Sequence, residues 1–500
     1  MFSRRADPST PNEATYQGGN SAPKRECNDV FFLLIFVGLV VMTVVFAASY
    51  GSTLVDLTNV HNVGSTTGMK MVLKYAAYAG ASSTILSLVW ILIMMLMGEL
   101  MIWFTMISMI VACIFGAIFM TKRLHDLGQK YYWWPAVAFG TVALLLALYT
   151  YCIRHRIKFA AKHLRVAGSA LFRLPVVFIV TICMVGVQLA WGVTWVTGTF
   201  GVLNKMEYIV ISDACSNAAT YNTPACTVTV KYGGVVGMFI VMLIVFFWGA
   251  FVVEGIIAVT VSGTVGSWRN NVAAPCITVS SWLRAVTLNL GSICFGSLIV
   301  AILETIMAIL SMFQSAAQAE GNCVLACVAG CLACIVGCIK SWMETFNRYA
   351  YTYIGIHGFS FMTAGRHVSD MFAAKGWTAI VNDDLAQWVF FLGNLVVGAI
   401  SAWVAIHFVG SDVTTQIFPG VKDPEYIVGV CAFLVGYIVN SVFMSVMASA
   451  VATVFVLWAE DPQGWQLTQP DHYARLHAAW LEIYPAEYND GHGKPLTTVA

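Results

Sequence analysis

Long apolar stretches, separated by short polar segments, run along almost the whole chain. A bilayer core about 30 Å thick takes roughly 20 apolar residues of helix to cross. Ten stretches meet or approach that length, and they are too continuous for barrel strands, in which apolar and polar residues alternate. The pattern predicts an all-α polytopic membrane protein with about ten transmembrane helices, at about 30–49, 75–97, 100–120, 132–152, 176–199, 233–261, 286–312, 349–368, 385–409 and 426–458.

The eighth stretch, 349–368, is the weakest of the ten because it is short and contains tyrosine and histidine. The segment before it, 313–348, fits either the exterior or the cytosol. If 349–368 does not cross the membrane, every later segment changes sides.

The distribution of basic residues predicts the orientation. Segment 153–175 contains six Lys and Arg residues, and cytoplasmic loops are enriched in these residues. Placing this segment inside puts the N-terminus in the cytosol, and ten crossings return the C-terminus there. We therefore expect a cytosolic arm over 1–29, a transmembrane domain over 30–458 and a cytosolic tail over 459–500.

The composition supports a membrane protein and excludes several functions. Hydrophobic residues make up 59% of the chain and charged residues 10%, against roughly 25% charged residues in soluble domains. The net charge of +1 gives no basic excess for nucleic acid. The chain contains no phosphate-binding loop, nucleophile elbow or metal-ligand pair. We expect no enzyme activity, no cofactor and no metal.

Two groups of cysteines stand out. Cys215 and Cys226 lie in a polar exterior loop, where they form either a disulfide or two free thiols. A second group recurs at spacings that place its members on one helical stripe. The stripe fits lipid attachment, intermolecular pairing or, the reading we favour, close packing against a neighbouring helix. It consists of Cys323, Cys327, Cys331, Cys334 and Cys338.

Acidic and aromatic residues inside the apolar stretches suggest a binding site. Glu254 and Glu304 lie deep in their stretches, where a carboxylate is either a structural group or a counter-charge for a cation or proton. Trp191 and Trp195 share a helical face, and Trp248 precedes Glu254. Indole rings attract quaternary ammonium groups, although most membrane tryptophans are interfacial anchors. The hypothesis is that these five side chains surround one hollow and bind substrate.

From about residue 176 onward the chain resembles the choline transporter-like family, in particular its fungal and plant branch. Before residue 176 the similarity is limited to the span layout and residues 27–36. The resemblance is carried by five blocks in family order: VTVSGTVGSW (259–268), LGSICFGSLIVAI (290–302), FNRYAYTYIGIHGFSFMTAGRHV (346–368), AAKGWTAIVNDDL (373–385) and SAVATVFVLWAEDP (449–462).

The resemblance implies a ten-helix plasma-membrane transporter with both termini cytosolic, which takes up choline or, in some members, ethanolamine. Proton export in exchange has been proposed for the family. The chain departs from the family pattern at five positions. Aromatic residues are usual at two of them, and histidine, tyrosine and aspartate at the others. These positions are Arg269, Asn270, Ala258, His357 and Ala448.

Two functions are compatible with the sequence. The first is a secondary transporter of a small organic cation, choline-like, with the lipid bilayer, the substrate and protons as partners. The second is a non-transporting membrane organiser that acts in lipid homeostasis or trafficking through packing and the cysteine stripe.

Overall fold

The computed structural model describes residues 27–50, 66–128, 133–205, 209–211, 228–230, 232–271, 276–408 and 424–483 of the 500-residue chain. These residues are almost entirely helical, which confirms the all-α class. Two three-residue strands, β1 (Ile209–Ile211) and β2 (Val228–Val230), form an antiparallel pair. The helices are α1 (Val30–Tyr50), α3 (Thr66–Asp126), α4 (Trp134–Arg173), α5 (Val176–Lys205), α6 (Tyr232–Arg269), α7 (Ile277–Val286), α8 (Leu290–Ala319), α9 (Cys323–His357), α10 (Phe361–Phe408), α12 (Pro424–Glu460), α13 (Pro462–Thr468) and α14 (Pro470–Ile483).

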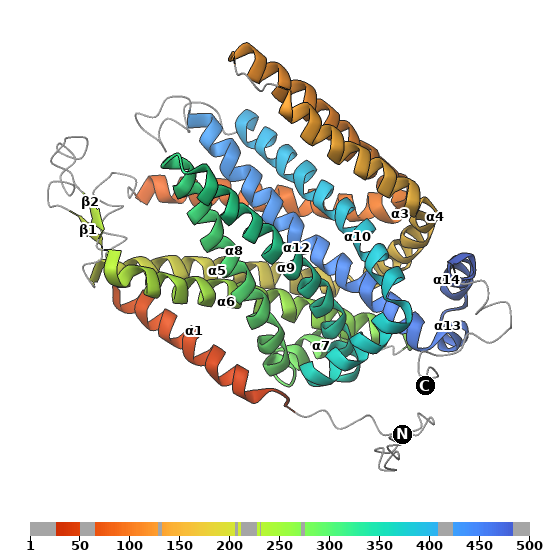
Figure 1. The fold of residues 1–500 in the computed structure, drawn as a ribbon. Helices are drawn as coiled ribbons and strands as arrows, with labels where there is room; N and C mark the ends of the chain where they lie inside the picture. The colour runs from red at the N-terminus through yellow and green to blue at the C-terminus, as the bar shows by residue number, and fades with distance from the viewer. Residues whose placement is uncertain are drawn as a thin grey trace, which may run out of the picture.

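Within the described ranges, nine helices are long and apolar enough to cross a membrane. One of them, α3, contains a kink at Met97, whose backbone angles are not helical. The kink separates the two predicted spans 75–97 and 100–120, and Figure 1 shows the second leg of α3 turning back alongside α4. Gly98 follows the kink and packs closely on Leu164 of α4. Counting both legs, about ten crossing segments are confirmed.

The predicted span 349–368 is wrong. Gly358 adopts a left-handed conformation that ends α9 at His357, and α10 begins at Phe361. The eighth crossing is instead α9 itself, Cys323–His357. The undecided segment 313–348 is therefore the end of α8 and most of α9, so the number of crossings is unchanged and the later segments keep their sides.

The basic segment 153–175 is the second half of α4 rather than a loop. Its apolar residues, such as Ile157 and Leu164, are buried, whereas Arg154 and Lys158 are exposed. An amphipathic helical end of this kind suits the boundary between lipid and water. The C-terminal α14 docks here: Trp480 Nε1 donates a hydrogen bond to His163 Nε2 over 3.3 Å, and both residues are buried.

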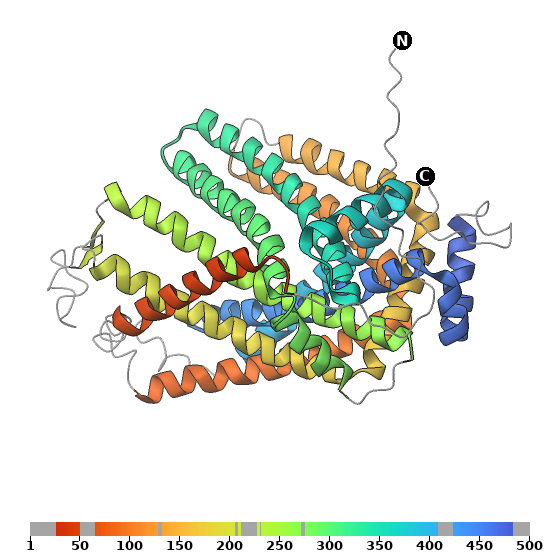
Figure 2. The ribbon, with the colours of Figure 1, turned by 90° about the horizontal axis from the view of Figure 1, so that it is seen from below.

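The core of the bundle is α12. In its most apolar section 89% of the residues are buried, against 6% in α1. Figure 1 shows α12 in the middle, with α1 on one side and the hairpin of α3 and α4 on the opposite side. In Figure 2, α8 and α9 form a hairpin that projects from the bundle. The helices packed most extensively against α12 are α3, α4, α6, α9 and α10.

The cysteine stripe lies on the outer half of α9, and all five of its cysteines are exposed. The interpretation that they pack against a neighbouring helix is wrong. That role belongs to small residues on the other face, because Ala326 and Ala329 are buried and Gly337 faces Met307 of α8.

The start of α1 is fixed to the start of two other helices. The Asp29 carboxylate accepts hydrogen bonds from Ser292 Oγ of α8 at 2.6 Å and from the backbone N–H of Phe361 of α10 at 2.9 Å. Both partners lie in the first turn of a helix, where the backbone dipoles favour an anion. A Cβ at Gly291 would collide with the backbone of Asn28 and Asp29. The chain therefore enters the bundle at the end where α8 and α10 begin.

Candidate functional site: a charged cavity closed at one end

A cavity of about 340 Å³ lies among α6, α8, α9, α10 and α12. Its size is within the range of small-molecule sites. Its lining contains both aromatic rings and polar side chains. The aromatic residues are Phe251, Tyr351, Phe390, Phe391 and Tyr437, and the uncharged polar ones are Ser297, Asn347, Gln387, Asn394, Ser441, Ser445 and Ser449.

The cavity lining has more acidic than basic side chains. Glu254 of α6 and Glu344 and Arg348 of α9 line it. In their usual ionised forms, two carboxylates and one guanidinium give the lining a formal charge of −1. Gln387 holds the guanidinium, because its carbonyl oxygen accepts from both terminal nitrogens of Arg348 at 2.7 and 2.8 Å. The residue Glu254 is exposed although it lies inside the helix bundle, so its carboxylate reaches the space of the cavity.

Hydrogen bonds between helices fix several of the polar lining residues. The Asn347 side chain donates to the carbonyl of Gly296 at 2.8 Å, and Ser297 Oγ lies 3.0 Å from the Tyr351 hydroxyl. A preorganised lining of this kind reduces the ordering that a ligand has to induce.

Beyond the cavity, α6, α9 and α12 pack in close contact. A Cβ on Gly355 of α9 would collide with the backbone carbonyl of Val259 and with Ser262 of α6. Thr453 Oγ1 of α12 donates to Ser262 Oγ at 3.0 Å, and both are buried. Small residues allow helices to approach this closely. These contacts form the floor of the cavity.

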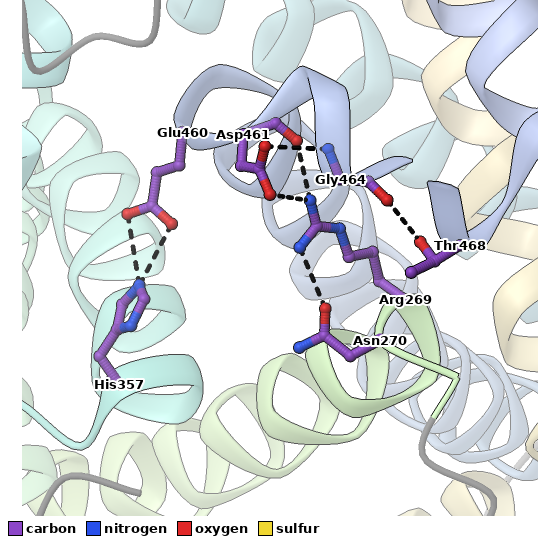
Figure 3. A network of polar contacts seen from close by, with 7 residues as sticks. All are labelled: Arg269, Asn270, His357, Glu460, Asp461, Gly464 and Thr468. Carbon is purple, nitrogen blue, oxygen red and sulfur yellow. Dashed lines mark hydrogen bonds and ion pairs between the residues drawn. The ribbon is translucent and has the colours of Figure 1, made fainter. Parts of the chain in front are cut away.

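The same three helices end in a network of ion pairs on the far side of this floor (Figure 3). Arg269 Nη2, at the end of α6, donates to the Asp461 carboxylate at 2.6 Å and to its backbone carbonyl at 2.8 Å. His357 Nε2, at the end of α9, lies 3.2 Å from Glu460. Two consecutive residues at the end of α12, Glu460 and Asp461, therefore bind two neighbouring helices. We call this group, Arg269, His357, Glu460 and Asp461, the closed-end network.

The short helix α13 reinforces the network. Asp461 caps α13, because its carboxylate accepts from the backbone N–H of Gly464 at 2.9 Å. A Cβ at Gly464 would collide with both Arg269 and Asp461. Trp465 of α13 is fully buried and packs edge-to-face on Trp268 of α6. The turn from α12 to α13 is thus clamped onto the end of α6.

The structure places the three predicted tryptophans outside the cavity lining. Trp191 and Trp195 of α5 donate their indole N–H groups to backbone carbonyls of α6, at Phe246 and Met242, over 3.1 and 2.7 Å. Trp248 is buried and donates to the carbonyl of Cys294 on α8 at 2.9 Å. In this structure the three indoles join helices to one another.

The two predicted glutamates have different positions. Glu254 lines the cavity. Glu304 of α8 lies outside the lining, one turn beyond Val300, where it forms an ion pair with Lys340 of α9. Of the five side chains expected around one hollow, the structure brings Glu254 to the cavity and leaves the others outside its lining. The predicted disulfide of Cys215 and Cys226 falls outside the described residues.

Sequence reasoning missed Glu344 and Arg348 because their charges made 340–348 look like the end of a loop. A signal was present, since Lys340, Glu344 and Arg348 are spaced four apart and share one helical face. Within the residues that the structure describes, no group of three or more His, Cys, Asp or Glu side chains is placed to hold a metal ion.

Comparison with known proteins agrees with this architecture. The family model described as "Plasma-membrane choline transporter" matches residues 137–463. The chain is similar to Protein PNS1 of Mycosarcoma maydis, with 27% identity over 94% of this chain and 86% of that protein. It is also 27% identical to Protein PNS1 of Yarrowia lipolytica, over 93% of this chain and 81% of that protein. A third similar protein is Protein PNS1 of Kluyveromyces lactis, with 26% identity over 93% and 84% of the two chains.

The matched region runs from α4 to α13 and includes every helix that lines the cavity and both sides of the closed-end network. Because the family model covers well over half of the chain, this multi-pass membrane protein belongs to the plasma-membrane choline transporter family.

Proposed function

We propose that the chain is a secondary transporter of a small organic cation, choline or a related amine such as ethanolamine. Family membership supports a transporter. The observation that carries the substrate class is the cavity, which combines aromatic rings with one excess negative charge. A permanent cation without strong hydrogen-bond donors needs this combination, since it is bound by charge and by ring faces rather than by directed hydrogen bonds.

The lining divides the binding between two kinds of group. Glu254 supplies a counter-charge, and the Phe251 ring lies three residues earlier on the same helix, so both are on one face of α6. Cation–π contact contributes up to about 2 kcal/mol when the cation is desolvated. We propose Glu254 as a substrate contact and assign the three predicted tryptophans to helix packing.

In this proposal, contacts at the ends of the helices that line the cavity close and open it on one side of the membrane. The closed-end network and the packed floor seal the cavity toward the end of α12. Release on that side requires Asp461 and Glu460 to separate from α6 and α9. In the orientation predicted from the distribution of Lys and Arg, this side faces the cytosol, and both termini lie there.

The driving force in this proposal is the membrane potential. A monovalent cation gains about 2.3 kcal/mol per 100 mV on moving to the negative side. Proton exchange, proposed for the family, would use a titratable carboxylate in the cavity, and Glu254 is our candidate. The family description also supports location in the plasma membrane, which imaging of the tagged protein tests.

The test is uptake of radiolabelled choline and ethanolamine by proteoliposomes that contain only the purified chain. We expect saturable uptake that rises with an inside-negative potential. Unlabelled choline should compete, whereas its neutral isostere 3,3-dimethylbutan-1-ol should compete at least tenfold less well, because it fills the same volume without the charge. An imposed pH gradient tests the exchange of protons.

Absence of uptake by the folded protein under every gradient would overturn the proposal and favour the membrane organiser. In that case replacement of the five exposed cysteines of α9 should disturb cellular localisation. Equal competition by choline and its neutral isostere would leave a transporter but reject the cation site.

A further inference from the structure

One helical turn beyond the lining residues Val300 and Glu344, one lysine lies between two glutamates. Lys340 Nζ is in contact with Glu304 Oε2 of α8, and it lies 3.4 Å from Glu344 Oε1 on its own helix. Glu344 lines the cavity, whereas Lys340 and Glu304 do not. The same ammonium therefore interacts with one carboxylate that lines the cavity and one that lies outside its lining.

The three side chains are partly shielded from water. The exposed fractions are 21% for Lys340, 25% for Glu304 and 40% for Glu344. At this degree of shielding an unpaired charge costs more than at the surface. A lysine ammonium is a compact charge on a flexible stem, so a small change of rotamer is enough to move it toward either carboxylate.

This arrangement keeps the charges paired whether the cavity is empty or occupied. When the cavity holds no cation, Lys340 compensates Glu344. When a cation approaches Glu344, Lys340 retains Glu304 as a partner, so that no ammonium is left unpaired. Without Glu304, Glu344 would be the one ion-pair partner left to Lys340 among the residues that the structure describes, and Lys340 would hold it more firmly.

We propose that Lys340 competes with the transported cation for Glu344, and that Glu304 sets the strength of this competition by drawing the ammonium away from the cavity. The inference rests on the proposed function, because it assumes that the cavity binds an organic cation. Lys340 and Glu304 are positioning residues in this proposal, since they act on the substrate through Glu344.

The variants Lys340→Met, Glu304→Gln and the double variant test the competition by choline uptake in proteoliposomes. Lys340→Met removes the competitor, so KM should fall at least threefold, and the maximal rate should fall because release is slower. Glu304→Gln frees Lys340 for Glu344, so KM should rise at least threefold. The double variant should have the low KM of Lys340→Met, because Glu304 acts only through Lys340.

Lys122→Met, which removes an exposed lysine at the end of α3, is the matched control and should leave KM unchanged. Lys340→Arg tests the charge alone: it keeps the competing cation, so KM should stay well above that of Lys340→Met.

Two results would overturn the inference. One is an unchanged KM in both single variants, which would make the ion pairs purely structural. The other is a double variant with the wild-type KM, which would mean that the charges act by simple summation at a distance. In both cases wild-type uptake persists and the proposed function stands. Loss of choline uptake in the wild-type protein itself would instead reject the proposed function. If Lys340→Met does not fold, the rise in KM expected for Glu304→Gln still decides the question.

Discussion

Charged side chains gather in two places along α6, α9 and α12, and the two places are built differently. In the cavity, the carboxylates of Glu254 and Glu344 outnumber the single guanidinium of Arg348. In the closed-end network, each acidic residue has a basic partner: Asp461 binds Arg269 and Glu460 binds His357. The cavity lining has one carboxylate more than it has basic groups, whereas each carboxylate of the network is hydrogen-bonded to a basic side chain.

In the proposed transport cycle, the cavity binds the substrate and the closed-end network keeps one end of the protein shut. A surplus carboxylate in a shielded cavity is stabilised by a cation from outside, whereas a matched network is complete without a ligand. The packed floor of Ser262, Gly355 and Thr453 keeps the two apart. A transporter needs both, because substrate has to be held while one end is shut.

The five positions at which the sequence was expected to depart from the family pattern lie in the same two places. Ala258 and Ala448 line the cavity, and Arg269, Asn270 and His357 belong to or contact the closed-end network (Figure 3).

The largest expected effect comes from removing the surplus charge of the cavity. Glu254→Gln keeps the size of the side chain and makes the lining neutral, so choline uptake at low concentration should fall at least tenfold, equivalent to about 1.4 kcal/mol. Uptake into proteoliposomes measures it. Glu320→Gln is the control, because Glu320 is exposed at the turn between α8 and α9. Similar uptake by the two variants would contradict a role for the cavity charge.

A smaller effect should follow from removing an aromatic ring of the cavity. Phe251→Leu removes the face on which an ammonium would rest, so the KM for choline should rise roughly threefold to tenfold. Trp195→Phe is the comparison, since this indole bonds to α6 outside the lining. Its KM should stay at the wild-type value. A larger rise in KM for Trp195→Phe than for Phe251→Leu would instead support a binding site at the tryptophans.

Gly464→Ala should loosen the closed-end network, although it changes no charge. The added Cβ displaces Arg269 or Asp461. Because Asp461 is half exposed, the ion pair contributes only about 1 kcal/mol, which corresponds to roughly fivefold faster hydrogen exchange in α13. Asp461→Asn should have a similar effect. Gly186→Ala on α5, where a Cβ meets nothing within 4 Å, should leave exchange in α13 unchanged.

The smallest effect is a pH dependence at the start of α14. Burial, with help from Arg475 and Arg173, lowers the pKa of His472 below its usual value, against the opposing charge of Asp471. The ring also packs on Trp268. Neutral His472 is therefore favoured in the docked state, and undocking takes up a proton at low pH.

We expect docking of α14 to be fully stable above about pH 6.5, the usual histidine pKa, and to weaken as the pH falls below it. Protection factors of the amides of 470–483 at pH 5.5 and 7.5, that is, exchange rates divided by the intrinsic rate at each pH, measure this, and His472→Phe should remove the difference. Lower protection at the higher pH would contradict the sign.

Much of the fold was predictable from hydropathy alone. A run such as 30–49 has no charge, and the cost of unpaired backbone groups in lipid leaves helix as its conformation. The prediction failed at α9, where Lys340, Glu344 and Arg348 interrupt the apolar pattern. Their charges belong to a crossing helix because they face a cavity and Glu304, which is a relation between helices and not a property of one segment.

By itself, the sequence determined that this chain spans a membrane, about how many helices do so and which family it resembles, because these follow from local composition and order along the chain. The structure decided which side chains share the cavity. Glu254 has that role because α6 turns it toward α9 and α12, whereas Trp248, on the same helix, is turned toward α1 and α8. The rotation of each helix about its axis is set by packing against its neighbours, so it becomes definite only when all of them are in place.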